Sequence, residues 1–282
     1  MKFGVSLMRV SYKGAVPVAK AAEALGYDSL WAADHLVWPV EYAANYPYDK
    51  SGRPAVPPDV PTLDCWSYLT WLAAHTRTIQ LGTAVYILPL RDPLVTARAA
   101  MTVDVLSGGR LLFGLGAGWL AEEFQFAGLD YRTRGRRMDE CIEAIERLWT
   151  LDTPSYEGSL VKIGKVKFEP KPVRKPRPPF IIGGESDAAL RRAARLGDGW
   201  IGVPHTPEEA AGMVKKILAW RADGPLAGRP MDITIMSMDS PSRQNIERYR
   251  EAGVTRLVVS PFNRTGEAEA GLEKFAKEAM GA

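Results

Sequence analysis

Apolar residues recur along the chain in two alternating patterns. Short apolar runs rich in β-branched residues, typical of buried parallel strands, alternate with longer stretches whose apolar positions follow the period of an amphipathic helix. The pattern predicts strands at residues 3–7, 29–33, 79–85, 110–115, 180–183, 199–203, 233–238 and 256–260. It predicts helices at residues 16–25, 64–75, 94–106, 135–149, 188–196, 207–220, 242–252 and 266–280. This alternation indicates a closed α/β fold, the (β/α)8 or TIM barrel.

Two insertions interrupt the alternation. Residues 37–61 contain six prolines and four aromatic residues, and they follow a predicted strand at the end where such barrels place their chemistry. They are a candidate substrate lid. The second insertion, residues 154–178, alternates polar and apolar positions between residues 156 and 169 around two glycines. It predicts a β-hairpin that serves in packing or in dimer contact.

Length and composition favour one domain. A chain of 282 residues with 46% apolar content can bury one large core, so we expect residues 1–282 to form a single barrel domain with the two insertions. The formal net charge is only +3, and basic residues are interspersed with acidic ones. Neither nucleic acid nor a membrane surface is therefore expected as a partner. A small molecule is the expected partner.

Two features of the sequence bear on the cellular compartment of the protein: its first residues and its cysteines. A strand predicted at residues 3–7 leaves no room for a signal peptide, and no apolar run approaches the roughly 18 residues of a membrane span. We therefore expect a cytoplasmic protein. Cys65 and Cys141 lie in predicted helices and are expected to be buried thiols, not a disulfide or a metal site.

Candidate catalytic residues follow the second predicted strand. Asp34 and His35 come directly after residues 29–33, where the carboxyl end of a barrel strand opens onto the mouth. A histidine there can exchange a proton with a substrate oxygen because its ordinary pKa lies near the working pH. His75 and His205 are weaker candidates. We expect His75 to act at a helix end and His205 to meet cofactor or solvent.

Glycines mark the exits of two further strands. Gly114, Gly116 and Gly118 alternate at the end of residues 110–115, which either admits a flat ligand to the backbone or allows tight packing. Gly183, Gly184, Glu185 and Ser186 follow another strand. Ser186 is a candidate N-cap, and the first turn of the following helix offers N–H groups to an anion such as phosphate, unless it is an ordinary cap.

Five blocks of sequence, in order, resemble the bacterial luciferase-like superfamily of flavin and deazaflavin TIM barrels, and within it the coenzyme F420-dependent oxidoreductases. The resemblance covers about the first two hundred residues closely and the remainder only by pattern. The blocks are GYDSLWAADHL (26–36), LGTAVYILPLRDP (81–93), LSGGRLLFGLGAGWLAEEF (106–124), RGRRMDECIEAIERLW (134–149) and IIGGESDAALRRAARLGDGW (181–200).

The resemblance implies an enzyme that transfers hydride between coenzyme F420 and an unidentified small organic substrate, working as a homodimer. The alternative is an FMN-dependent luciferase-like monooxygenase that receives reduced flavin from a partner reductase. A flavin-binding barrel without activity would be favoured only if Asp34, His35 and the glycine turn were missing, and all are present.

The same resemblance assigns roles to individual residues. Asp34 contacts the cofactor ring, and His35 faces the reaction centre. The resemblance implies a β-bulge with a cis peptide bond, between Ala84 and Val85, that supports the cofactor ring. It also implies that the cofactor phosphate lies at the turn before residue 187, where Glu185 contributes its backbone. The residues expected to bind cofactor are Asp34, Thr83, Ala84, Val85, Gly116, Gly183, Gly184, Glu185, Ser186, Gly202 and Val203, with the cis bond joining Ala84 to Val85.

Departures from the family limit its known activities. Trp119 occupies the position where sugar-phosphate dehydrogenases of the deazaflavin branch have a glutamate, and Gly116 and Ala117 stand where luciferases have a cysteine and an arginine. Neither activity is therefore expected. Trp38 and Trp119 are instead expected to form an aromatic wall for an uncharged or aromatic substrate. Glu122 either supplies a carboxylate to that substrate or stabilises a helix N-terminus.

Overall fold

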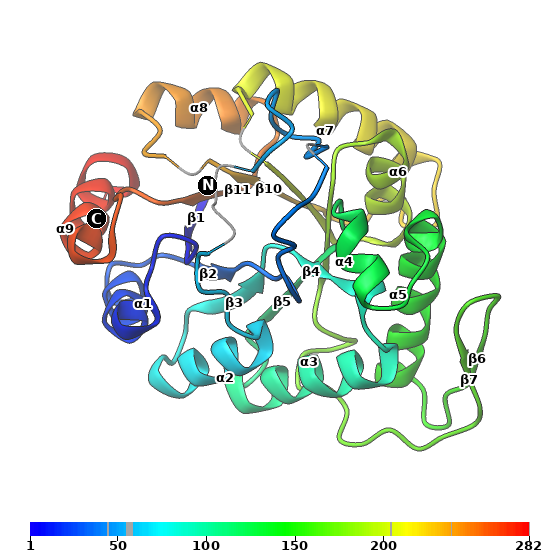
Figure 1. The fold of residues 1–282 in the computed structure, drawn as a ribbon. Helices are drawn as coiled ribbons and strands as arrows, with labels where there is room; N and C mark the ends of the chain where they lie inside the picture. Colours follow the sequence, from blue (N-terminus) through cyan, green and yellow to red (C-terminus); the bar gives the residue numbers. More distant parts are fainter. Residues whose placement is uncertain (44, 55–58, 204, 238, 282) are drawn as a thin grey trace.

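The computed structural model describes residues 1–43, 45–54, 59–203, 205–237 and 239–281, which form a closed parallel barrel (Figure 1). The strands follow the order β3, β2, β1, β11, β10, β9, β8 and β5, and β3 pairs with β5 to close the ring. The predicted TIM barrel is confirmed. Met238, the last residue of one predicted strand, lies outside the described residues. The barrel strands are β1 (Lys2–Ser6), β2 (Ser29–Ala32), β3 (Gln80–Thr83), β5 (Leu111–Gly116), β8 (Phe180–Gly183), β9 (Gly199–Gly202), β10 (Asp232–Met236) and β11 (Arg256–Val259).

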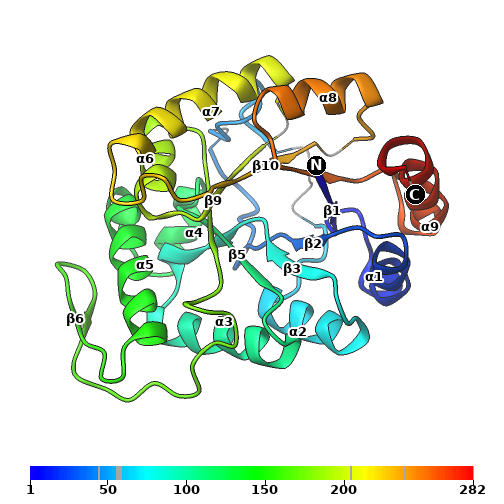
Figure 2. The same ribbon diagram turned by 180° about the vertical axis from the view of Figure 1, so that it is seen from behind.

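Helices surround the barrel on its outer side (Figures 1 and 2). Several begin where a side chain caps the first free N–H groups, as the side chains of Asp64, Asp92, Ser186, Thr206 and Ser242 do. None of the described helices is long and apolar enough to cross a bilayer. The outer helices are α1 (Ala15–Ala24), α2 (Cys65–His75), α3 (Pro93–Ser107), α5 (Arg134–Thr150), α6 (Asp187–Leu196), α7 (Pro207–Ala222), α8 (Arg243–Glu251) and α9 (Ala268–Phe275).

Side chains fill the barrel interior. Trp31 is fully buried there, and its Nε1 donates a hydrogen bond to Ser29 Oγ at 2.9 Å. The indole needs a neighbouring glycine, because a Cβ on Gly82 would lie 2.5 Å from the ring. The interior is therefore a packed apolar floor beneath the mouth, as this fold requires. It consists of Trp31, Leu112, Ile181, Ile201, Met236 and Val258.

The chain leaves β3 through an irregular step. β3 ends at Thr83, the peptide bond from Ala84 to Val85 is cis, and the short strand β4 (Tyr86–Ile87) then pairs with β5. The expected cis bond is thus confirmed. Ala84 and Val85 pack on the apolar floor while remaining partly exposed. We call these two residues the platform.

Tight packing explains two of the alternating glycines, Gly114 and Gly116 of β5, which lie against the end of β3 and the platform. A Cβ on Gly114 would lie 1.7 Å from the carbonyl oxygen of Thr83, and one on Gly116 would lie 2.4 Å from Val85 Cγ2. Of the two interpretations of these glycines, the structure shows close chain packing. The expected contact between Gly116 and a cofactor stays a prediction.

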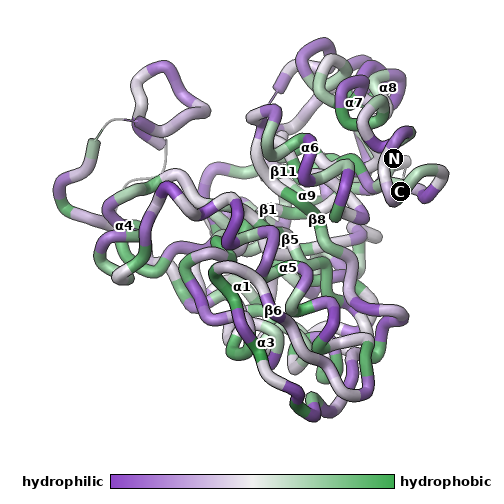
Figure 3. Tube along the Cα trace, turned by 90° about the vertical axis from the view of Figure 1, so that its right-hand side faces the viewer, coloured by the Kyte–Doolittle hydropathy of each residue, from purple (hydrophilic) through white to green (hydrophobic). Residues whose placement is uncertain are grey.

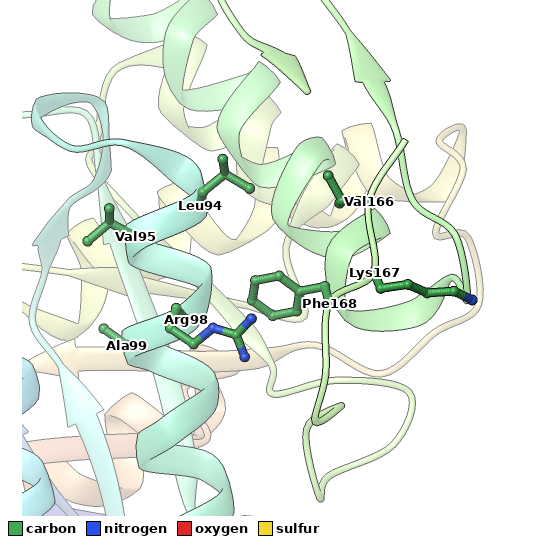
Figure 4. Close-up of a pocket in the computed structure, with 7 residues that line it drawn as sticks. All are labelled: Leu94, Val95, Arg98, Ala99, Val166, Lys167 and Phe168. Atoms are coloured by element: carbon green, nitrogen blue, oxygen red, sulfur yellow. The ribbon is translucent and has the colours of Figure 1, made fainter. Parts of the chain in front are cut away.

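The second insertion contains a small hairpin. β6 (Tyr156–Glu157) and β7 (Lys162–Ile163) pair antiparallel and project beside α5, so the paired part is shorter than the predicted alternation (Figure 2). The chain after β7 runs along α3 and leaves an outer groove of about 530 Å³ between them (Figure 4). The groove is lined by Leu94, Val95, Arg98, Ala99, Val166, Lys167 and Phe168.

Replacing Gly114 should destabilise the barrel. In Gly114→Ala the added methyl group meets a backbone carbonyl that cannot rotate away, so we expect a loss of about 1–3 kcal/mol in the free energy of unfolding. Gly212→Ala is the control, because this exposed glycine in α7 has open space and alanine favours the helix. Urea denaturation of the two variants measures the difference, and equal stability of both would contradict the packing account.

Candidate functional site

The mouth of the barrel gathers ionisable side chains from three parts of the chain. Asp34 and His35 follow β2, and Arg91 precedes α3. Glu122 and Glu123 lie in the short helix α4 (Ala121–Phe126), which follows β5. Figure 3 shows the lid-like insertion extending beyond the barrel on the same side as α4. We call residues 37–61 the lid, of which 37–43, 45–54 and 59–61 are described.

Glu123 holds the start of the lid. Its carboxylate is fully buried and accepts hydrogen bonds from the backbone N–H of Leu36 at 2.5 Å and of Val37 at 3.4 Å. Its other oxygen lies 3.2 Å from Nδ1 of His35. Because a carboxylate can only accept, we assign the proton on the neutral ring to Nδ1. Nε2 of His35 is then the nitrogen left to act on a ligand.

Asp34 joins β2 to the segment after the platform. Its side chain is 2% exposed, and its two oxygens accept from Arg91 Nη2 at 2.7 Å and from the backbone N–H of Ile87 at 3.0 Å. Burial raises the pKa of Asp34, while Arg91 and the Ile87 N–H oppose that rise. The guanidinium also lies over the ring of Tyr86, 4.7 Å from its centroid. The expected contact of Asp34 with a cofactor ring stays a prediction.

Aromatic rings from the lid pack against His35 and against Trp119, which precedes α4. The ring centroid of Trp38 lies 4.2 Å from His35 and 6.2 Å from Trp119. Tyr46 lies 5.0 Å from Trp119, and Tyr48 lies 5.3 Å from Tyr46. Trp38 and Trp119 thus form a wall beside His35, as the sequence predicted, and their contact with substrate stays a prediction. We call Trp38, Tyr42, Tyr46, Tyr48 and Trp119 the aromatic cluster.

Glu122 also holds the lid. One carboxylate oxygen accepts from the backbone N–H of Ala43 at 2.9 Å. The other is buried and finds no hydrogen-bond partner within the described ranges. Both acidic residues of α4 therefore contact the lid, and a role of Glu122 toward substrate stays a prediction.

The glycine turn after β8 lies beside the platform. A Cβ on Gly183 would come within 2.9 Å of Val85 Cγ1. Gly184 has a φ of +107°, a backbone conformation that residues with a side chain rarely adopt. Ser186 caps α6, accepting from the N–H of Ala189 at 3.2 Å as predicted. The predicted ring support and the predicted phosphate turn are therefore neighbours in space.

The side chain of Glu185 is bonded to residues outside the glycine turn. Its carboxylate accepts from the backbone N–H of Val203 at 3.0 Å and lies 2.6 Å from Nε2 of His205. The pKa of His205 is raised, chiefly by this hydrogen bond, so the histidine can carry the compensating charge. Close packing accounts for Gly202, whose Cβ would lie 2.5 Å from the ring of Trp200. Cofactor contacts of Gly202 and Val203 stay predictions.

Sequence reasoning missed Glu123, Arg91 and the partner of His205. The sequence shows two adjacent acids at a helix start, and nothing in it distinguishes the partly exposed Glu122 from the buried Glu123. Arg91 precedes the capping residue Asp92 and reads as an ordinary loop residue. The described residues contain no cluster of three or more His, Cys, Asp or Glu side chains suited to a metal ion.

Removing Arg91 should destabilise the protein in a pH-dependent way. Arg91→Met keeps packing on Tyr86 but leaves Asp34 buried without its counter-charge, which raises the pKa of Asp34 further. The folded state then retains a proton that the unfolded state releases. The deficit in unfolding free energy should therefore grow as pH rises from about 4, reaching about 3–5 kcal/mol near neutrality.

Denaturation across that pH range measures this deficit. The control is Arg264→Met, an exposed arginine paired with Glu267, which should have little effect. A deficit that stays constant with pH would mean that Asp34 does not depend on Arg91 for its charge.

Comparison with known proteins supports the same architecture. A protein from Mycobacterium tuberculosis (strain H37Rv), itself uncharacterised, is 32% identical over 285 residues, covering 98% of each chain. The F420-dependent glucose-6-phosphate dehydrogenase of Amycolatopsis mediterranei (strain U-32) is 31% identical over 209 residues, 69% of this chain and 57% of that protein. The solved structure of an F420-dependent secondary alcohol dehydrogenase in complex with an F420–acetone adduct superposes with a TM-score of 0.81 and 17% identity, covering 99% of this chain and 98% of that one.

The family model described as luciferase-like monooxygenase matches residues 1–279, nearly the whole chain. The barrel closure described above agrees with that match. The chain belongs to the luciferase-like monooxygenase family.

Proposed function

We propose that this protein is an oxidoreductase that uses coenzyme F420 to transfer hydride to or from a small organic substrate. The observation that carries the proposal is His35, held at the mouth of the barrel by the buried carboxylate of Glu123 with Nε2 left for a ligand. The F420 dependence of the named relative from Amycolatopsis supports the choice of cofactor.

The residues at the mouth fit a flat ring system with a phosphate-bearing tail. The platform of Ala84 and Val85 presents partly exposed apolar atoms above the apolar floor, which suits a ring face. Gly183 and Gly184 lie beside the platform, where the first turn of α6 can receive an anion through backbone N–H groups. Because a positive charge on His205 can compensate the charge of Glu185, this glutamate repels an anion at the turn less than an unpaired carboxylate would. Bound in this place, coenzyme F420 would supply the hydride donor or acceptor.

His35 moves the proton in this account. When an alcohol is oxidised, Nε2 of His35 accepts the hydroxyl proton, and in the reverse direction it returns the proton to the carbonyl oxygen. Glu123 keeps the ring in the required tautomer through Nδ1 and stabilises the positive charge that the ring gains. The lid helps to exclude water, because Trp38 packs directly on the histidine ring.

The alternative is a monooxygenase that receives reduced FMN from a partner reductase. The description of the matching family model favours it, because it names monooxygenases. The same platform and glycine turn would suit a flavin. The two functions differ in the cofactor bound and in the use of oxygen.

A titration with each cofactor tests the proposal. The protein should bind coenzyme F420 more tightly than FMN and should not consume oxygen when reduced F420 is supplied. The physical reason is that deazaflavin carries carbon in place of the reactive flavin nitrogen and forms oxygen adducts poorly. Tighter binding of FMN together with substrate-dependent oxygen uptake would instead establish the monooxygenase.

Kinetics of two variants test the assigned proton transfer. His35→Ala should lower kcat by about 10²- to 10⁴-fold, with the dissociation constant for F420 nearly unchanged. Glu123→Gln keeps an oxygen acceptor but loses the charge, so it should lower kcat less and leave KM nearly unchanged. The control is His75→Ala, an exposed histidine at the end of α2. Wild-type turnover in His35→Ala would make that histidine a structural residue.

A further inference from the structure

The aromatic cluster limits what can reach His35. The ring of His35 packs on Trp38 at 4.2 Å and lies edge-on to Trp119 at 6.4 Å between centroids. Tyr42 lies 6.4 Å from Trp38 and 6.1 Å from Trp119. A molecule whose oxygen bonds to Nε2 of His35 therefore lies beside the indole rings of Trp38 and Trp119, with Tyr42 packed against both. Such rings favour flat apolar partners through stacked and edge-to-face contacts.

The charges beside the cluster disfavour an anionic substrate. Glu122 and Glu123 are carboxylates beside the cluster, whereas Arg91 is engaged by Asp34 and by the carbonyl oxygen of Ile87. One oxygen of Glu122 is buried without a described partner. A phosphate or carboxylate bound beside Glu122 and Glu123 would face like charge, and Arg91 is not free to meet it.

Tyr46 and Tyr48 of the lid are expected to stay neutral in this field. Burial raises the pKa of both Tyr46 and Tyr48, and the nearby charge of Glu185 raises each further. The cluster therefore presents uncharged aromatic surface. Asp34, Glu123 and Glu185 already have donors, and the guanidinium of Arg53, 5.3 Å from the ring centroid of Tyr42, repels a second cation. Among the described carboxylates of this region, Glu122 keeps one buried oxygen without a described partner, and the neutral hydroxyl of an alcohol can donate to it.

We propose that the substrate is an uncharged, flat and mostly apolar alcohol or ketone, such as an aryl or alicyclic one, bound between His35 and the aromatic cluster. The proposal rests on the proposed function and narrows its substrate to one class. It separates this protein from the relative named for glucose 6-phosphate, because a sugar phosphate carries the charge that this site disfavours.

Binding of matched probes to the cofactor-free protein tests the proposal. Calorimetry would compare 1-phenylethanol, mandelate and 1-phenylethylamine, which share a phenyl ring and are uncharged, anionic and cationic near neutral pH. Glucose 6-phosphate serves as an anion without an aromatic ring. We expect 1-phenylethanol to bind about tenfold more tightly than any charged probe. Equal or tighter binding of a charged probe, or no measurable binding of 1-phenylethanol, would overturn the proposal.

Two tryptophan variants locate the binding. Trp119→Leu keeps an apolar side chain but removes the ring contacts, so it should weaken the binding of 1-phenylethanol by up to about tenfold. The matched control is Trp71→Leu, an exposed tryptophan of α2 that packs only with rings of its own helix among the described contacts. Equal affinity in wild type and Trp119→Leu would place the probe elsewhere and contradict the assignment.

These measurements separate the two proposals. The probe titrations need no cofactor, so they report on the substrate class alone. If 1-phenylethanol binds as expected while F420 does not bind, the substrate class stands and the proposed function fails. If F420 binds but a charged probe is preferred, the proposed function stands and the substrate class fails.

Discussion

The buried charge of Glu123 is the constraint on which the mouth of the barrel depends. A carboxylate removed from water needs donors, and this one takes the backbone N–H of Leu36, the backbone N–H of Val37 at the start of the lid, and Nδ1 of His35. That requirement determines where the lid begins and which nitrogen of His35 remains for chemistry. Trp38 comes three residues after His35 in the sequence, and its ring packs against the ring of the histidine. One acidic residue of α4 thus organises both the proposed proton carrier and the aromatic cluster.

A second buried carboxylate connects this arrangement to the ring support. Asp34 is bonded to Arg91 and to the backbone of Ile87, which lies two residues beyond the platform. The adjacent residues 34 and 35 are therefore bonded to two neighbouring elements of the mouth, Asp34 to β4 and His35 to α4, and Ile87 of β4 packs in one cluster with Phe124 of α4. Because Val85 of the platform in turn lies against Gly183, a series of contacts links the proposed proton carrier, the proposed ring support and the proposed phosphate turn.

Local signals predicted the fold well and the site only partly. Strand and helix patterns depend on nearby residues, so the barrel, the cap at Ser186 and the position of His35 followed from them. The ion pair of Asp34 with Arg91 joins residues 57 positions apart, and the bond of His35 with Glu123 joins residues 88 positions apart. Such pairings depend on how loops fold back, which periodicity does not encode. For the same reason the alternating glycines were ambiguous, because only the packed structure shows Thr83 and Val85 lying against them.

A structure of the protein co-crystallised with coenzyme F420 tests the central claim most directly, since that claim is about where the ring and His35 meet. The account predicts the deazaflavin ring against Ala84 and Val85, its phosphate at the turn formed by Gly183 and Gly184, and Nε2 of His35 facing the space beside the ring. A ring bound elsewhere, for instance in the outer groove between α3 and the chain after β7, or a His35 that turns Nε2 toward Glu123 in the complex, would contradict it.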